Sequence, residues 1–122
     1  MIYTPDRNDL VLLDFDPIKG KEIGKYRPAL ILSSKEYSKA SGLLMCCPIS
    51  TSIRNTPTEV AVNNLDKPSV VASSLIQTLD YKKRKIKFIS QAEKGVFEEV
   101  LIRLIPLITG DDYLSKILHD YR

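Results

Sequence analysis

The order of the apolar segments constrains this fold more than any other feature: short runs come first, and one long amphipathic segment comes late. Short apolar runs are typical of strands, whereas apolar residues at three- and four-residue spacing are typical of helices. The segment 95–109 has that helical spacing, and the runs before it do not. Strands followed by a helix predict an α+β domain with a small antiparallel sheet or barrel.

Polar stretches that contain glycine or proline separate the expected strands. Strands are predicted over residues 8–16, 29–33, 43–49, 59–62 and 70–76, and Ile86 and Phe88 alternate with lysines in a further segment. Ser34 is predicted to cap a short helical turn that ends at Gly42. Pro48 is predicted to lie at a sheet edge or a bulge. Pro106 should kink the last turn of the long helix, and Gly110 should follow its end.

A chain of 122 residues has the size of one domain. We expect that domain over residues 1–110, with a helical extension over 111–122. The hydrophobic share of 43% and the charged share of 27% are ordinary for a globular protein. No apolar run reaches the ~18 residues of a membrane span, and residues 1–7 do not read as a secretory signal. A net charge of +3 permits an anionic partner without requiring one.

Cysteine and histidine usage argues against a metal site. Cys46 and Cys47 are adjacent, and strand neighbours point to opposite faces, so a bridge between them is not expected. Together with His119 they are too few for a four-ligand zinc site. We therefore expect a reduced, cytoplasmic protein that uses no metal and no cofactor.

The segment 19–28 is the first candidate for chemistry, because it holds four cations, one carboxylate and one aromatic ring. Arg27 stands at the border between loop and strand, where its planar and permanently charged fork suits a phosphate. Two glycines let the backbone approach a ligand closely. A solvated, flexible turn explains the same composition, and on composition alone it is the more frequent case.

Hydroxyl groups form the second candidate. Ser50, Thr51 and Ser52 follow one another, and Arg54 comes two residues later. Such a group can bind an anion, although loop hydroxyls more often bond to their own backbone.

A basic run forms the third candidate. Four cations at 82–85 follow Tyr81, and with Lys87 five of the 18 cations lie within six residues. Cations track phosphates and aromatic rings stack on bases, so this pattern suits a nucleic-acid strand. A run of charge is more often a solvated face.

Together these segments resemble the MazF/PemK-type toxins of bacterial toxin–antitoxin pairs. The resemblance covers most of residues 6–109 and is most specific at 8–17 (NDLVLLDFDP). Further matching positions are Gly20, Glu22, 27–33, 47–50, 57–60, 79–84 and 96–108. The resemblance implies an α+β fold of the PemK/CcdB-like type, a small SH3-like antiparallel β-barrel with an appended C-terminal helix, and a homodimer.

The resemblance also implies an activity. Members of the family cleave single-stranded RNA, often mRNA, without a metal and leave 2′,3′-cyclic phosphate and 5′-OH ends. RNA supplies its own nucleophile, the 2′-OH, so the protein needs only to position the phosphate and stabilise negative charge. A cognate antitoxin is expected to inhibit the toxin by laying an acidic segment over the RNA groove.

By the same resemblance, Arg27 matches the catalytic arginine, and Glu22 matches an acidic residue that orients it or assists proton transfer. Ser50 stands at the place of the catalytic threonine, and Thr51, one position later, is the alternative. The residues expected to bind RNA are Lys25, Tyr26, Arg54, Gln77, Tyr81, Lys82, Lys83 and Arg84.

Departures from the family pattern keep other functions open. The chain has Ser74-Leu75 where an Asp-Gln-like pair is usual, and Tyr81 where tryptophan is common. These changes and Ser50 allow a non-catalytic toxin of the same barrel, such as one that poisons DNA gyrase, or a degenerate member that only binds RNA or an antitoxin. A general RNA-binding module is a further alternative, and it predicts salt-sensitive affinity with an intact substrate.

Overall fold

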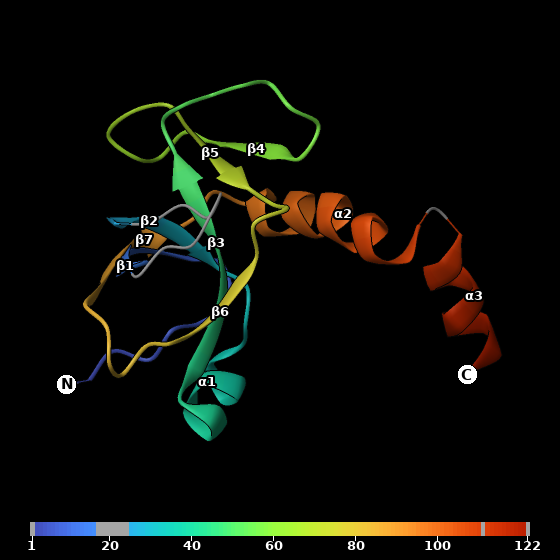
Figure 1. The fold of residues 1–122 in the computed structure, drawn as a ribbon, viewed down its shortest axis with the longest axis horizontal. Coiled ribbons are helices and arrows are strands. Elements are labelled where there is room, and N and C mark those ends of the chain that lie inside the picture. Colours follow the sequence, from blue (N-terminus) through green and yellow to red (C-terminus); the bar gives the residue numbers. More distant parts are fainter. Residues whose placement is uncertain (1, 17–24, 111, 122) are drawn as a thin grey trace.

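The computed structural model describes residues 2–16, 25–110 and 112–121 (Figure 1). Within these residues the chain forms one sheet of seven strands and three helices. In chain order the elements are β1 (Asp9–Asp14), β2 (Tyr26–Ile31), α1 (Lys35–Ser41), β3 (Leu43–Ser50), β4 (Glu59–Val62), β5 (Ser69–Ala72), β6 (Gln77–Asp80), β7 (Ile86–Gln91), α2 (Val96–Thr109) and α3 (Tyr113–Asp120).

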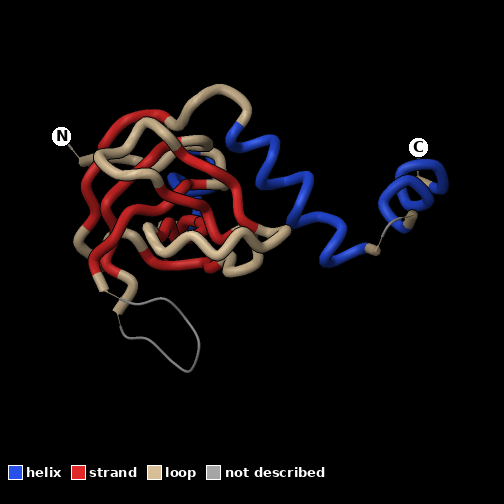
Figure 2. The backbone as a smooth tube through the Cα atoms, turned by 90° about the horizontal axis from the view of Figure 1, so that it is seen from above, coloured by secondary structure: helices blue, strands red, loops and turns tan. Residues whose placement is uncertain are grey.

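The strand pairings of the described residues are all antiparallel. The order across the sheet is β4-β5-β3-β2-β1-β7, and β6 pairs with β3 off this path. Figure 2 shows the strands curling around a common centre, with α2 leading away from them. The sheet is open, with β4 and β7 at its ends. The predicted α+β class, an antiparallel sheet with appended C-terminal helices, is confirmed.

β3 lies inside the sheet, and Pro48 fits there because of a gap in the pairing. The carbonyl of Met45 faces β2, where it accepts a hydrogen bond from Leu32, so by alternation the nitrogen of Pro48 faces away from β2. On that side β3 pairs with β6 as far as Cys46 and with β5 from Ile49 onward. Proline lacks an N–H group, and neither ladder needs one at this position. The predicted edge or bulge at Pro48 is therefore wrong.

Two apolar cores lie on the two faces of the sheet. The core under α2 consists of Leu10, Leu30, Cys47, Ile49, Val60, Val62, Val71, Ala92, Val96 and Val100. The second core consists of Val11, Leu13, Phe15, Ala29, Ile31, Leu44, Cys46 and Tyr81. Neighbouring residues of one strand enter different cores, as the two-residue period of a strand requires. Each large apolar side chain buried this way contributes about 1.5–3 kcal/mol to folding.

The short helix α1 has both of the predicted boundaries. The hydroxyl of Ser34 accepts a hydrogen bond from the backbone N–H of Tyr37 at 3.2 Å, which is the bond of an N-cap. Gly42 ends the helix with φ 75°, a left-handed conformation that glycine adopts at little cost. The prediction for this segment is confirmed.

The strand predicted over residues 70–76 is wrong in its second half. β5 ends at Ala72, whose carbonyl accepts a hydrogen bond from Leu75 at 3.1 Å in a turn. β6 then begins at Gln77 and pairs with the first half of β3. The chain must turn here because β5 and β6 pair with different halves of the same strand. Neither glycine nor proline marks this turn in the sequence.

α2 runs through Pro106 to Thr109 and buries Val96, Val100 and Leu104. α3 buries no residue and lies beyond α2, away from the sheet (Figure 1). It falls within the segment predicted to be a helical extension, while the division of the chain at residue 110 stays a prediction. None of the helices that the structure describes is long and apolar enough to span a bilayer.

Candidate functional site

Arg27 and Ser50 belong to paired strands, β2 and β3, and fall on the same face of the sheet. Ala29 pairs with Pro48, and these two partners lie two residues from Arg27 and from Ser50. The antiparallel register, continued by two residues, sets Arg27 opposite Ser50 with both side chains on one face of the sheet. β1 supports Arg27 from its other side, where Leu13 is the paired residue. Strand pairing thus joins the cation of the first cluster to a hydroxyl of the second.

Ser50 and Thr51 face opposite sides of the sheet, and the cavities at the end of β3 reflect this. Ser50 lines a cavity of about 320 Å³, which we call the Ser50 cavity. Its polar lining residues are Ser50, Ser52, Arg54, Thr56, Thr58, Glu59 and Ser74. Thr51 lines a different cavity of about 570 Å³ together with Leu12 and Pro28. The geometry therefore favours Ser50 over Thr51 as the neighbour of Arg27.

The hydroxyl of Ser50 keeps a proton to donate. Its Oγ accepts a hydrogen bond from the backbone N–H of Ser52 at 3.0 Å. A hydroxyl has one donor and two acceptor lone pairs, so this bond leaves the O–H of Ser50 available to an anionic oxygen. Ser74 and Leu75, the departure from the family pattern, line the same cavity. A chemical change at those two positions therefore alters the wall of the Ser50 cavity.

Arg27 is half-buried, and this affects its electrostatics. Desolvation lowers the pKa of its guanidinium from the ordinary value. The group keeps its charge, because the pKa of a free guanidinium lies above ~12. Partial burial also reduces screening by water, so the attraction between Arg27 and a phosphate is stronger than at an open surface.

The residues just before Arg27 lie at the surface. Tyr26 is exposed, and the ammonium of Lys85 lies 4.8 Å from the centroid of its ring. Lys25 is also exposed and has φ 70°. Both side chains are accessible to a strand of nucleic acid. Glu22, the expected acidic partner of Arg27, lies outside the described residues.

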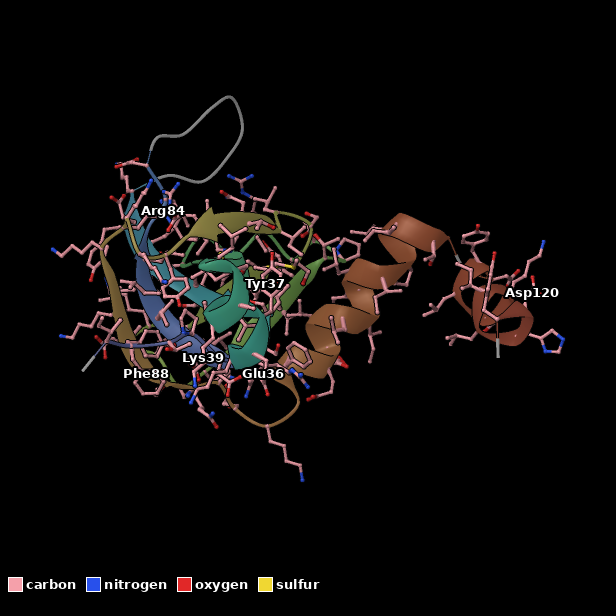
Figure 3. All side chains as sticks on the ribbon, turned by 90° about the horizontal axis from the view of Figure 1, so that it is seen from below. Glu36, Tyr37, Lys39, Arg84, Phe88 and Asp120 are labelled. Atoms are coloured by element: carbon pink, nitrogen blue, oxygen red, sulfur yellow. The ribbon has the colours of Figure 1, made fainter. Side chains whose placement is uncertain are left out.

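Arg84 differs from the expectation that it binds RNA. Its Nη1 donates hydrogen bonds to the backbone carbonyls of Asp14 at 3.1 Å and of Asp16 at 2.8 Å. The carboxylate of Asp16 accepts a further bond from the backbone N–H of Lys25 at 3.0 Å. Figure 3 shows Arg84 at an end of the sheet, far from Asp120 on α3. Arg84 is thus engaged by the protein's own backbone and holds the end of β1 beside the start of β2.

The remaining expected RNA-binding residues divide into buried and exposed ones. Tyr81 is 4% exposed, and its hydroxyl donates to the carbonyl of Ser38 at 3.2 Å. Its ring belongs to a core and presents no face to a base, which corrects the stacking role expected for it. Gln77 is half-buried at the start of β6, whereas Lys82 and Lys83 are exposed.

Sequence reasoning missed Glu59, which organises the loop that carries Arg54. Its carboxylate accepts hydrogen bonds from the backbone N–H groups of Arg54 and Thr56. The sequence signal was the spacing Thr-x-x-Glu at 56–59. In a capping box the glutamate reaches back to the N–H of the residue three positions earlier. Glu59 makes that same contact here in a turn that leads into a strand.

Cys46 and Cys47 are buried free thiols. Burial raises the pKa of both, that of Cys47 to about 12. Neither is therefore a thiolate nucleophile at neutral pH. Across the described residues, no three His, Cys, Asp or Glu side chains gather in an arrangement that could hold a metal ion.

Comparison with known proteins gives consistent matches. A family described as PemK-like, MazF-like toxin of type II toxin-antitoxin system matches residues 6–108. The chain is 33% identical over 82 residues to the endoribonuclease toxin MazF of Escherichia coli K12, a match that covers 67% of this chain and 74% of that protein. It is 34% identical over 95 residues to the endoribonuclease MazF of Staphylococcus epidermidis, covering 71% and 79%.

Solved structures resemble the fold as a whole. A crystal structure of MazF from Deinococcus radiodurans superimposes with a TM-score of 0.83 at 34% identity, covering 88% of this chain and 98% of that one. A MazE-MazF crystal structure from the same organism gives a TM-score of 0.78 at 33% identity, covering 90% and 100%.

Proposed function

The chain belongs to the PemK-like, MazF-like toxin family of type II toxin–antitoxin systems, and from this premise we propose that it is a toxin that cleaves single-stranded RNA. The curated relatives at 33% and 34% identity are named endoribonucleases, which supports the activity. The observation that carries the proposal is the antiparallel register of β2 on β3, which runs to Ala29 and Pro48. By strand alternation Arg27 and Ser50, each two residues beyond that pair, belong to the same face.

In the proposed reaction the RNA supplies the nucleophile, the 2′-OH beside the scissile phosphate. Its oxygen bonds to phosphorus as the bond from phosphorus to the 5′ oxygen breaks. The 2′ proton passes to a base and the leaving 5′ oxygen takes up a proton, so the products end in a 2′,3′-cyclic phosphate and a 5′-OH. The protein contributes positioning and stabilisation of the negative charge that develops on the phosphoryl oxygens.

The residues of the site divide the work of charge stabilisation and proton transfer in this scheme. Arg27 stabilises the phosphoryl oxygens and is the candidate proton donor to the leaving oxygen. The O–H of Ser50 donates to a second phosphoryl oxygen, and Thr51 is the alternative donor. Glu22 orients Arg27 or accepts the 2′ proton.

Exposed cations supply affinity for the RNA backbone. Lys25, Lys82 and Lys83 are exposed, and Tyr26 offers an accessible ring for a base. Each phosphate contact releases a counterion, so binding should weaken as salt rises. Arg54 is exposed as well, and it lines the Ser50 cavity.

The partners proposed for this toxin are an antitoxin and a second copy of the chain. The likeness to a structure titled MazE-MazF supports a cognate antitoxin. An acidic segment of that antitoxin would compete with RNA for the exposed cations. A homodimer and a cytoplasmic site of action complete the proposal, because cytoplasmic mRNA is the proposed substrate; light scattering tests the dimer.

The deciding experiment compares the wild-type protein with Arg27→Ala on a long single-stranded RNA in EDTA. The wild type should give discrete cuts with 5′-OH ends, and the variant should be slower by at least about 100-fold because the main stabilising cation is gone. Lys94→Ala, which removes an exposed cation beyond β7, is the matched control and should cut normally.

The outcomes separate the proposed functions. Cleavage by a folded Arg27→Ala variant at the native rate would refute the assignment of Arg27. Intact RNA from a folded wild type, together with inhibition of supercoiling, would identify a non-catalytic toxin of the same fold. Ser74 and Leu75, which replace the usual Asp-Gln-like pair in the cavity wall, favour this non-catalytic function. Their substitution is then the first variant to make.

A further inference from the structure

Residues 52–55 of the loop at 51–58 direct their side chains alternately to two adjacent cavities, while Thr56 lines both. Ser52 and Arg54 line the Ser50 cavity, whereas Ile53 and Asn55 line a second cavity of about 350 Å³. Successive side chains thus alternate between the two cavities, although residues 51–58 belong to no strand. A slip of one residue would therefore turn Arg54 out of the Ser50 cavity. Something other than strand pairing must hold the register of this loop.

Glu59 holds that register through the backbone. Its two carboxylate oxygens lie 3.1 and 3.2 Å from the backbone nitrogen of Arg54, and Oε1 lies 3.1 Å from that of Thr56. Asn55, between them, has φ 56°. A residue in this left-handed conformation lets the N–H groups on both sides converge on one anion. Three hydrogen bonds to a charged acceptor then fix the loop just before β4.

The same carboxylate leaves the guanidinium of Arg54 available. Among the described residues, that guanidinium makes no hydrogen bond or ion pair, and the side chain is exposed. The carboxylate of Glu59 thus accepts from the backbone N–H of Arg54 and forms no ion pair with its guanidinium. Because N–H donors surround the carboxylate, it repels a nearby phosphate less than a free carboxylate would.

We propose that Glu59 is a positioning residue for RNA. By fixing the loop backbone, it holds the guanidinium of Arg54 and the hydroxyl of Ser52 at the Ser50 cavity, where they bind the nucleotide next to the scissile phosphate. Arginine offers a fork for phosphate, and hydroxyls can either donate or accept at a ribose or a base. This inference rests on the proposed function of the site. It predicts an effect on substrate binding and little effect on the chemical step.

The test is a double-mutant cycle in the full chain. Glu59→Ala, Arg54→Ala and the double variant are assayed on a short single-stranded RNA with one cut site, and binding is measured on the same RNA with a 2′-O-methyl group at that site. Each single change should raise KM and Kd about tenfold and leave kcat within about twofold, as loss of a binding contact does. The KM and Kd of the double variant should equal those of the single variant that binds RNA more weakly, because both changes remove the same contact.

Two further variants serve as controls. Glu98→Ala removes an exposed carboxylate from α2 and should change neither KM nor Kd. Glu59→Gln keeps one accepting oxygen and should fall between the wild type and Glu59→Ala. If Glu59→Ala does not fold, the cycle is run with Glu59→Gln.

The outcomes distinguish this inference from the proposed function. Three results would each overturn the inference. The first is a Kd increase in the double variant that equals the product of the two single increases. The others are a fall in kcat alone and a loss of thermal stability with an unchanged Kd. If the wild type binds the methylated RNA but does not cut the unmodified one, the proposed function fails, and the Kd pattern still decides the role of Glu59. If the wild type neither binds nor cuts, both are overturned.

Discussion

At the scale of single residues, the two neighbouring hydroxyls at the end of β3 should differ sharply in function. By the alternation of β2 and β3, Ser50 falls on the same sheet face as Arg27, whereas Thr51 lines the cavity on the other side. Ser50→Ala should lower kcat/KM by about 100-fold, as removal of a donor to a developing oxyanion does, and Thr51→Ala should stay within about twofold. Ser50→Thr keeps the hydroxyl and should retain most activity. Initial rates on a single-site RNA measure this, and equal losses from both alanine variants would contradict it.

The sequence could not choose between these two hydroxyls, because the choice depends on a long-range register. The common face of Arg27 and Ser50 follows from the pairing of Ala29 with Pro48, which no local pattern encodes. The stacking role predicted for Tyr81 failed for the same reason, because it too depends on long-range packing. A tyrosine in a basic run suits RNA, and only the packed structure shows that its ring fills a core. Local sequence therefore found the chemistry of the site, and tertiary structure selected the residues that share it.

At the scale of elements, Arg84 connects the turn before β7 to the end of β1 through hydrogen bonds. Arg84→Gln should lower the free energy of unfolding by about 1.5–3 kcal/mol, the usual contribution of hydrogen bonds to a charged group. It should leave the salt dependence of RNA binding unchanged, because Arg84 is engaged by carbonyls of Asp14 and Asp16. Urea denaturation and Kd at several salt concentrations measure the two effects.

Lys83→Ala is the matched comparison for Arg84, because Lys83 is exposed in the same turn. A phosphate contact to single-stranded RNA contributes about 0.7 to the slope of log K against log salt. Lys83→Ala should reduce the slope by about that amount and leave stability unchanged. A smaller slope for Arg84→Gln with unchanged stability would place Arg84 on the RNA instead.

The elements themselves were largely predictable, and the exceptions have physical reasons. The cap at Ser34 and the helical spacing of α2 are local signals, so both ends of α1 and the extent of α2 followed from sequence. The break between β5 and β6 did not follow from sequence, because the turn lies inside the apolar run 70–76. The turn is needed because β5 and β6 pair with different halves of β3. The prediction of an edge or bulge at Pro48 failed for a related reason. β3 has two successive partners, β6 and β5, on the same side, and local sequence does not show the gap between them.

At the scale of the whole molecule, α3 stands apart from both cores. It buries no residue, and Tyr113, Leu114 and Leu118 of its apolar side are exposed. Deletion of residues 111–122 should therefore remove no core packing. We expect the melting temperature to change by less than about 2 °C, because a loss of 1 kcal/mol corresponds to about 4–8 °C in a domain of this class. The rate of RNA cleavage should be unchanged as well.

Calorimetry at two protein concentrations makes this deletion informative about assembly. A chain that stops at Gly110 and melts like the full chain at both concentrations would show that α3 is dispensable for the fold. A fall of more than about 5 °C would contradict the prediction. If that fall depended on protein concentration, the exposed apolar side of α3 would be packing on a second copy, because binding between copies stabilises the folded state by mass action.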